Sequence, residues 1–288
     1  QTSTGFLLGW IFYIPMFLVG VPAEVVVTVG SLNLIYQFWV HTEHIAKLGW
    51  YEWLFVTPSN HRVHHAQNDI YLDRNYGGVF IIWDRLFGTF QEELDEEPVI
   101  FGIRGPLHSW NPVRALTHIY VDMARDSWHA ARWSYKLKVW VGRTGWRPDD
   151  VARRYPREKN DLSHFHKYDP RVSTRVSLYA FFQLVAAVLL LNFMEGATLG
   201  YWSGVALWAL LLATTVVTAL WLEGRDVGHM LQLERLRLAC FGVLLGAAWQ
   251  GGAGAGILVS AALYGALNLL FLPLLRDDPG SDPAPLAQ

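Results

Sequence analysis

The sequence predicts an all-α, multi-pass membrane protein with a histidine-rich helical region that faces the cytosol. Three observations predict this fold class: a large apolar share, apolar blocks of membrane-helix length, and histidines clustered after the first block. Of the 288 residues, 52% are hydrophobic and 17% are charged, whereas soluble domains carry about 25% charged residues. A chain this apolar must bury its surface in a core or a bilayer, so intrinsic disorder is excluded.

Charge and cysteine content exclude two further classes of protein. The formal net charge is -2, so the chain has no basic excess with which to neutralise nucleic-acid phosphates. Cys240 is the single cysteine, so no disulfide scaffold can form within the chain.

The apolar residues form four blocks. The first, Gly5 to Val40, is divided by Pro15 and by the Val21-Pro22 break into two helices that span or half-span a bilayer. The other blocks are Val176 to Met194, Leu199 to Leu222, and Leu238 to Pro273, the last broken at Gly251 to Gly256 into two short helices. One such block could belong to a soluble core, but four together predict membrane helices. The segment 276–288 is expected to be a disordered tail.

Basic residues predict the orientation. Fifteen of the 23 Lys and Arg residues lie between Arg104 and Arg175, whereas the short connections at the other ends of the blocks carry none. The positive-inside rule therefore places the mostly helical region from His41 to Thr174 in the cytosol. Within it, Leu48 to Val56 is short and aromatic, and either lies along the lipid headgroups or packs in a core.

The start of the chain does not resemble a secretory signal. It lacks a basic first region and begins Gln-Thr-Ser-Thr. We therefore expect the sequence to be the carboxy-terminal part of a longer protein.

Candidate metal ligands concentrate in one short helix. Thr57 is a good N-cap and Pro58 suits the first helical position, so a helix should begin there. On it, His61, His64 and His65 have i, i+3 and i+4 spacing and share one face. Converging neutral imidazoles are typical metal ligands, although a polar surface helix whose histidines bind nothing has the same pattern. His41, at the end of the first block, is a further candidate ligand, and His44 is a weaker one.

A glycine-containing segment follows, Asn75-Tyr76-Gly77-Gly78, and leads to Asp84 and Arg85. The Asp84 carboxylate is a candidate acceptor for the second ring N–H of a ligand histidine. A local salt bridge to Arg85 is the competing interpretation. The acidic run from Glu92 to Glu97 is interpreted as a solvated loop.

The run QFWVHTEHIAKLGWYEWLFVTPSNHRVHHAQNDIYLDRNYGGVFIIWDRLFGTF, from Gln37 to Phe90, resembles the end of the fatty acid hydroxylase/sterol desaturase superfamily domain. The combination of HxxHH with NYGGxxxxWDRLFGT carries the resemblance. The forms QFWVHTE and TPSNHRVHH are most similar to its alkylglycerol monooxygenase branch. The resemblance covers 1–92. Of the rest, the charge and apolar patterns predict that 93–175 is a cytosolic, mostly helical connector and that 176–275 forms membrane hairpins, before the tail at 276–288.

The resemblance implies an O2-dependent monooxygenase in the endoplasmic reticulum or bacterial inner membrane, with its site facing the cytoplasm. Its cofactor would be a di-iron centre, with tetrahydrobiopterin as electron donor in this branch. Its substrate would be an ether lipid, a sterol or a fatty acyl chain, and it would hydroxylate or desaturate that lipid. The implied metal ligands here are His41, His61, His64 and His65. The family's earlier HxxxH and HxxHH boxes are expected ahead of Gln1, and without them these 288 residues are expected to be inactive alone.

Two other classes compete with the oxygenase. A zinc hydrolase could use an HxxHH helix, but no glutamate of the HExxH kind stands beside these histidines. A non-enzymatic membrane fragment would leave the histidines without metal. Two irons, one zinc or no metal per chain would distinguish the three classes.

Overall fold

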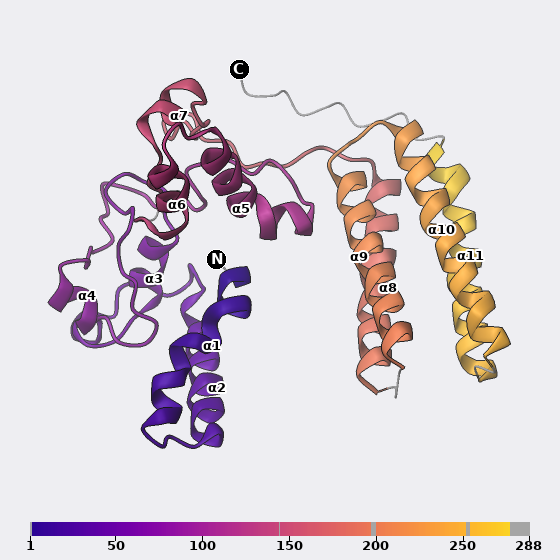
Figure 1. The fold of residues 1–288 in the computed structure, drawn as a ribbon, viewed down its shortest axis with the longest axis horizontal. Helices are drawn as coiled ribbons and strands as arrows, with labels where there is room; N and C mark the ends of the chain where they lie inside the picture. Colours follow the sequence, from indigo (N-terminus) through magenta and orange to yellow (C-terminus); the bar gives the residue numbers. More distant parts are fainter. Residues whose placement is uncertain (1, 144, 197–199, 252–253, 277–288) are drawn as a thin grey trace. The chain divides into compact units, whose positions relative to one another are not determined.

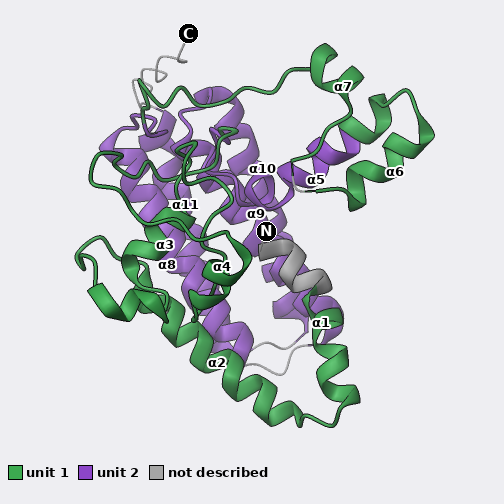
Figure 2. Ribbon diagram, turned by 90° about the vertical axis from the view of Figure 1, so that its left-hand side faces the viewer, with its two compact units in different colours: residues 1–106, 126–166 green, residues 107–125, 167–288 purple. Residues whose placement is uncertain are grey.

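The computed structural model describes residues 2–143, 145–196, 200–251 and 254–276, and every regular element in them is helical. The all-α prediction is therefore confirmed for the described part of the chain. The predicted tail 276–288 lies outside it, apart from Arg276. The chain forms two compact units, residues 1–106 with 126–166 (unit 1) and 107–125 with 167–288 (unit 2), coloured separately in Figure 2.

Unit 1 begins with two apolar helices, α1 (Thr2–Leu18) and α2 (Ala23–Val40), joined by the turn at Gly20 (Figure 1). Short elements follow: the 3-10 helix Gly49–Trp53, then α3 (Pro58–His64) and α4 (Ile82–Phe87). The unit also contains α6 (Trp133–Val141), α7 (Asp149–Arg154) and the last turn of α5 (Pro112–His129). A small core of Val63, Ala66 and Tyr71 lies beneath α3, so this helix stands on packed side chains.

The 3-10 helix is amphipathic. Glu52 is buried and faces α3, whereas Trp50 and Trp53 are 79% and 68% exposed. The two tryptophans therefore do not pack in a core, and their contact with lipid headgroups stays a prediction.

Unit 2 is built around four long helices, α8 (Thr174–Gly196), α9 (Tyr201–Leu222), α10 (Val227–Gln250) and α11 (Ala255–Arg276) (Figure 1). Helix α9 packs against both α8 and α10, and α10 packs against α11. With α2, the helices α8, α9 and α11 are long and apolar enough to cross a membrane. The predicted apolar blocks thus form membrane-length helices among the described residues.

Helix α10 differs from the expected short helix. It has 24 residues and begins eleven positions before the predicted block, where the Asp226 carboxylate accepts a hydrogen bond from the backbone N–H of His229. Sequence hydropathy missed the amino-terminal half of α10 because this half contains Glu234 and Arg237. These two residues form an ion pair and are 0% and 4% exposed, so their charges are compensated inside the unit.

Candidate metal centre

Local hydrogen bonds determine where α3 begins. The Thr57 side chain accepts a hydrogen bond from the backbone N–H of Asn60, and the Asn60 side chain accepts one from the backbone N–H of Thr57 at 3.2 Å. This capping box, with Pro58 in the first turn, confirms the predicted helix start. Thr57 also donates to the buried Glu52 carboxylate at 2.8 Å. The helix is therefore fixed at its amino end, one turn before His61.

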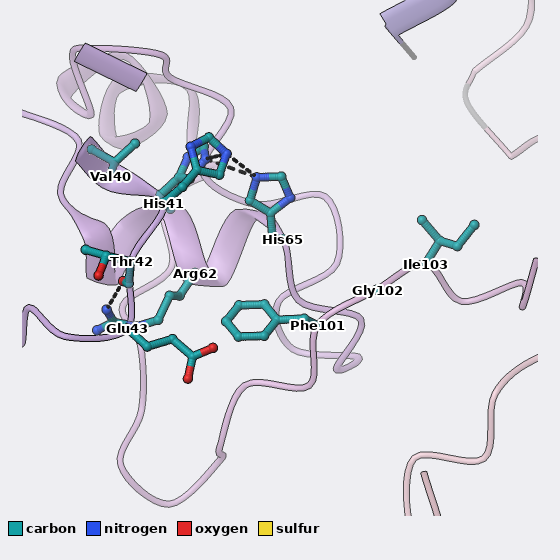
Figure 3. Close-up of a pocket in the computed structure, with 10 residues that line it drawn as sticks. Val40, His41, Thr42, Glu43, Arg62, His65, Phe101, Gly102 and Ile103 are labelled. Atoms are coloured by element: carbon teal, nitrogen blue, oxygen red, sulfur yellow. Dashed lines mark hydrogen bonds between the residues drawn. The ribbon is translucent and has the colours of Figure 1, made fainter. Parts of the chain in front are cut away.

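Three imidazoles converge at the other end of α3. The Nε2 atom of His61 lies 2.9 Å from Nε2 of His41 and 3.0 Å from Nε2 of His65, and the His41 and His65 Nε2 atoms are 3.2 Å apart. His61 and His65 are one helical turn apart. His41 lies just after the end of α2, and its ring is directed toward that of His65 (Figure 3). The structure thus brings together a histidine pair and a third histidine twenty residues away.

The His41 ring is held in the form that a metal ligand needs. Its Nδ1 lies 2.6 Å from the backbone carbonyl of Gln37. Because a carbonyl only accepts, Nδ1 carries the proton and Nε2 keeps a lone pair for the cluster. The acceptor belongs to the last turn of α2, where carbonyls lack helical partners. The end of this helix therefore orients His41 as an outer acceptor orients a metal-bound histidine.

The electrostatic setting favours the neutral form of His61 and His65. Burial, reinforced by the neighbouring charges of His65, His41 and His64, lowers the pKa of His61 to about 3. Burial also lowers the pKa of His65, with His64 and His41 adding to the effect. Neutral rings with free lone pairs are the ligand form of histidine.

The three nitrogens fit a single metal ion. A metal bound about 2.1 Å from two imidazole nitrogens at a right angle separates those nitrogens by about 3.0 Å. The observed separations of 2.9, 3.0 and 3.2 Å match that value. Imidazole suits iron as well as zinc, so the donor set and its spacing accommodate either metal.

His64 lies beside this trio rather than within it. Its ring stacks on that of His61, with centroids 5.5 Å apart. Its Nδ1 lies 3.4 Å from the backbone carbonyl of Arg74, a weak contact that leaves Nε2 free as an acceptor. His44, the weaker candidate, is exposed, and its backbone N–H bonds to the Thr42 hydroxyl.

The Asp84 carboxylate contacts its own loop. It accepts hydrogen bonds from the backbone N–H of Tyr76 at 2.7 Å, from that of Gly77 at 2.8 Å and from the Thr89 hydroxyl at 2.6 Å. A Cβ on Gly77 would lie 2.9 Å from this carboxylate and 2.6 Å from the Phe80 carbonyl oxygen. The first glycine of the NYGG segment is therefore needed for close approach. Arg85 contacts the Glu52 carbonyl and the Phe90 ring.

Arg62, which sequence reasoning did not single out, joins the two histidine segments. Its guanidinium donates to the backbone carbonyls of Thr42 and Ile45, just after His41, and to both carboxylate oxygens of Glu93 at 2.9 and 2.7 Å. Burial raises the pKa of Glu93, but the hydrogen bonds from Arg62 and nearby positive charge outweigh it, so the net shift is downward.

The acidic run is therefore not simply a solvated loop. Glu93 is bound by Arg62, and the Glu97 side chain accepts a hydrogen bond from Asn68. The chain returns to α3 at this point, which a charge pattern alone does not reveal.

A cavity of about 450 Å³ adjoins the histidine trio. Its lining contains the imidazoles of His41, His61 and His65, the apolar side chains of Val40, Phe101 and Ile103, and the polar side chains of Thr42, Glu43 and Arg62. Figure 3 labels these residues, apart from His61. A nitrogen cluster beside an apolar wall can place a hydrocarbon next to a bound metal.

Comparison with known proteins extends these observations. Residues 1–89 match the fatty acid hydroxylase family model. Alkylglycerol monooxygenase of Xenopus tropicalis is 38% identical over 182 residues, 62% of this chain and 40% of that protein. The enzyme of Homo sapiens is 36% identical over 186 residues, 65% of this chain and 41% of that protein. Ornithine lipid hydroxylase OlsE of Rhizobium tropici is 32% identical over 92 residues, 32% of this chain and 28% of that protein.

The similarity reaches further than the motifs indicated, since it covers 62–65% of the chain rather than its first 92 residues. The chain spans about two fifths of the length of these first relatives. No solved structure matches the chain. The predicted resemblance is confirmed: residues 1–89 match the fatty acid hydroxylase family, and the chain is similar to alkylglycerol monooxygenases over a longer stretch.

Proposed function

We propose that the full-length protein is a membrane-bound, iron-dependent monooxygenase that uses O2 to hydroxylate a C–H bond of a lipid. The observation that carries the proposal is the convergence of the His41, His61 and His65 Nε2 atoms within 3.2 Å of one another. The relatives support the reaction type, because their names include both a monooxygenase and a lipid hydroxylase. Those names favour hydroxylation over desaturation.

The residues of the chain have separate roles in this proposal. His41, His61 and His65 would hold one iron, and His64, on the adjacent face, would serve a second iron of a di-iron centre. Iron, when bound, supplies the activation of O2 that side chains cannot provide. The Gln37 carbonyl orients His41, and Arg62 holds the segment after His41 against α3. The apolar wall of the cavity would position the lipid chain and exclude water.

The similarity to alkylglycerol monooxygenases favours an ether lipid as substrate. Hydroxylation of the carbon next to the ether oxygen gives a hemiacetal. Collapse of the hemiacetal breaks the C–O bond and yields an aldehyde and a glycerol. We propose tetrahydrobiopterin as the electron donor, as the family resemblance implies, and a sterol or fatty acyl chain as the alternative substrate.

We also propose a multi-pass topology with the histidine site at the cytoplasmic face. The four membrane-length helices and the concentration of basic residues between Arg104 and Arg175 support it. In this arrangement a lipid reaches the cavity from the bilayer while the electron donor approaches from the cytosol.

The test uses the full-length protein purified from membranes. We expect two irons per chain, and O2 uptake that depends on a 1-O-alkylglycerol and tetrahydrobiopterin. The variants His61→Ala and His64→Ala should lose iron and abolish turnover. His166→Ala is the matched control, because His166 is exposed and lies outside the cluster, and it should retain both iron and turnover.

Three outcomes would contradict the proposal. One zinc per chain would indicate a hydrolase, and a chain without metal would indicate a non-enzymatic membrane protein. Iron-loaded protein that consumes no O2 with any ether lipid, sterol or fatty acyl substrate would refute the oxygenase assignment.

A further inference from the structure

The four long helices of unit 2 are packed differently along their length. At the end that contains the start of α8 and the end of α11, a core of seven buried residues fills the space between the helices, with side chains from all four. Tyr179, Trp221 and Leu275 are each at most 3% exposed. This end of the helical unit is closed.

A layer of polar side chains follows the closed end. Arg237 of α10 pairs with Glu234, and its guanidinium also donates to Thr214 of α9 at 3.2 Å and to Asn268 of α11 at 2.6 Å. Gln183 of α8 is 1% exposed and donates to the same Asn268 oxygen. At 1.5 Å per residue, Arg237 lies about 15 Å from the start of its helix, near the middle of the helical unit. Ionisable groups at such depth between membrane-length helices are expensive and usually functional.

Beyond the polar layer the helical unit is hollow. A cavity of about 680 Å³ lies between α8, α9, α10 and α11, and its lining is almost entirely aliphatic and aromatic. Along α8 it extends from Phe182 to Phe193, a length of about 16 Å. Leu189 of α8 and Leu263 of α11 line the cavity and are 64% and 59% exposed. The cavity therefore opens sideways between these two helices, where lipid would surround a membrane-spanning unit.

Two hydroxyl groups of the polar layer face this cavity. The Tyr264 hydroxyl accepts a hydrogen bond from Arg237 and donates to Gln183 at 2.9 Å, and the Thr214 hydroxyl accepts from Arg237 and donates to the Leu210 carbonyl at 2.8 Å. Each hydroxyl has used its proton and one lone pair, so each retains one lone pair. These two hydroxyls can therefore accept a hydrogen bond and cannot donate one, and Ser260, one helical turn before Tyr264, also lines the cavity.

We propose that unit 2 binds a neutral, single-chain lipid with a hydroxyl headgroup, whose chain fills this cavity and whose O–H donates to the hydroxyl of Tyr264 or of Thr214. The volume lies within the roughly 300–1,000 Å³ of small-ligand pockets, which suits one chain. A carboxylate or phosphate headgroup is disfavoured, because the five N–H groups of Arg237 are already engaged and its charge is balanced by Glu234. This site is separate from the proposed metal centre.

A purely structural role for the polar layer is the competing explanation, since buried polar groups also specify how helices pair. The two explanations make different predictions for variants in which the cavity is filled. If the layer only pairs helices, filling the cavity leaves lipid binding unchanged. If the cavity is a lipid site, filling it removes binding while the polar layer stays intact.

The probe is hexadecanol carrying a mid-chain diazirine, photolysed with the purified full-length protein in nanodiscs and mapped by mass spectrometry. We expect labelling within 182–193 and 256–267, and competition by 1-hexadecanol at concentrations at least fivefold lower than those of hexadecanoate or hexadecane. Ala261→Phe and Ala248→Phe, which fill the cavity, should reduce labelling more than tenfold. Their neighbours Ala262 and Ala247 do not line the cavity, so Ala262→Phe and Ala247→Phe should be labelled like the wild type.

Tyr264→Phe tests the headgroup contact. It should weaken competition by hexadecanol three- to tenfold and leave competition by hexadecane unchanged. His61→Ala should keep full labelling even though it loses iron, which separates this site from the metal centre. Equal labelling of the cavity-filling variants and the wild type would overturn the proposal, as would equal competition by alcohol, acid and alkane, or loss of labelling in His61→Ala.

Discussion

Replacing Asp84 distinguishes two roles for its carboxylate, which is 2% exposed. The carboxylate either holds its own loop together or accepts a hydrogen bond from a ligand histidine. In the structure it accepts hydrogen bonds from two backbone N–H groups, those of Tyr76 and Gly77, and from Thr89. Hydrogen bonds to a charged group contribute about 1.5–3 kcal/mol each. Asp84→Ala removes all three, which amounts to about 4–5 kcal/mol at the lower end of that range. That value approaches the whole stability of a small domain, so the segment should open locally.

Two milder substitutions should destabilise the segment by smaller amounts. Thr89→Val removes one hydrogen bond, for about 1.5 kcal/mol, or roughly tenfold faster amide exchange. Asp84→Asn keeps an oxygen for Tyr76 and Thr89 but places an amide N–H₂ against the Gly77 N–H, and should cost about 2–3 kcal/mol. The order of destabilisation is therefore Thr89→Val, Asp84→Asn, Asp84→Ala.

Hydrogen exchange followed by mass spectrometry on peptides covering 75–78 and 58–66 measures this order, with iron content determined in parallel. The opening should spread to α3, because the Asn75 side chain donates to the Asn60 carbonyl at 3.1 Å. If Asp84→Ala keeps the wild-type protection against amide exchange at Gly77, the role of the carboxylate in holding its loop together is refuted. If Asp84→Asn loses iron while loop protection is unchanged, the carboxylate instead supports a ligand histidine.

Two further predictions concern the histidine trio. The pKa of His61 is about 3, against an ordinary value of 6.5, so in metal-free protein the ring should stay neutral as the pH falls from 7 to 4. Over that range the unfolded state takes up the proton and the folded state does not, so the free energy of unfolding decreases as the pH is lowered. ¹⁵N NMR of labelled histidine follows the protonation of the ring directly. Arg62→Met should lower iron affinity more than tenfold, measured by chelator competition, because the two carbonyl contacts after His41 and the bidentate pair with Glu93 are lost together.

Each of these has its own control. In His41→Ala the pKa of His61 should rise, because one neighbouring charge and part of the burial are removed; a His61 ring that titrates near 6.5 in the wild type would contradict the proposed burial. For Arg62, the control is Lys47→Met, which removes an exposed ion pair with Glu92 and should leave iron affinity unchanged. An effect of Arg62→Met no larger than that of Lys47→Met would show that Arg62 does not hold the site together.

Several features of the site could be predicted from the sequence alone. Thr57 and Pro58 predicted the start of α3 because capping depends on side chains within three positions of one another. The i and i+4 spacing of His61 and His65 predicted a shared face for the same reason, since helix geometry converts short separations into known directions. The apolar blocks likewise predicted the membrane-length helices, because a bilayer sets their minimum length.

Other features depend on residues that are distant in the chain, and the tertiary structure alone decided them. His41 meets α3 because a chain reversal places the end of α2 beside it, and Arg62 reaches Glu93 across thirty-one positions. The charged half of α10 was misjudged because hydropathy counts Arg237 as exposed to solvent, whereas Glu234, Thr214 and Asn268 surround it. Composition and spacing determine which helices form and which side chains share a face, since those are local properties. Which faces meet is determined by long-range packing, and so are the histidine trio and the cavity between the helices of unit 2.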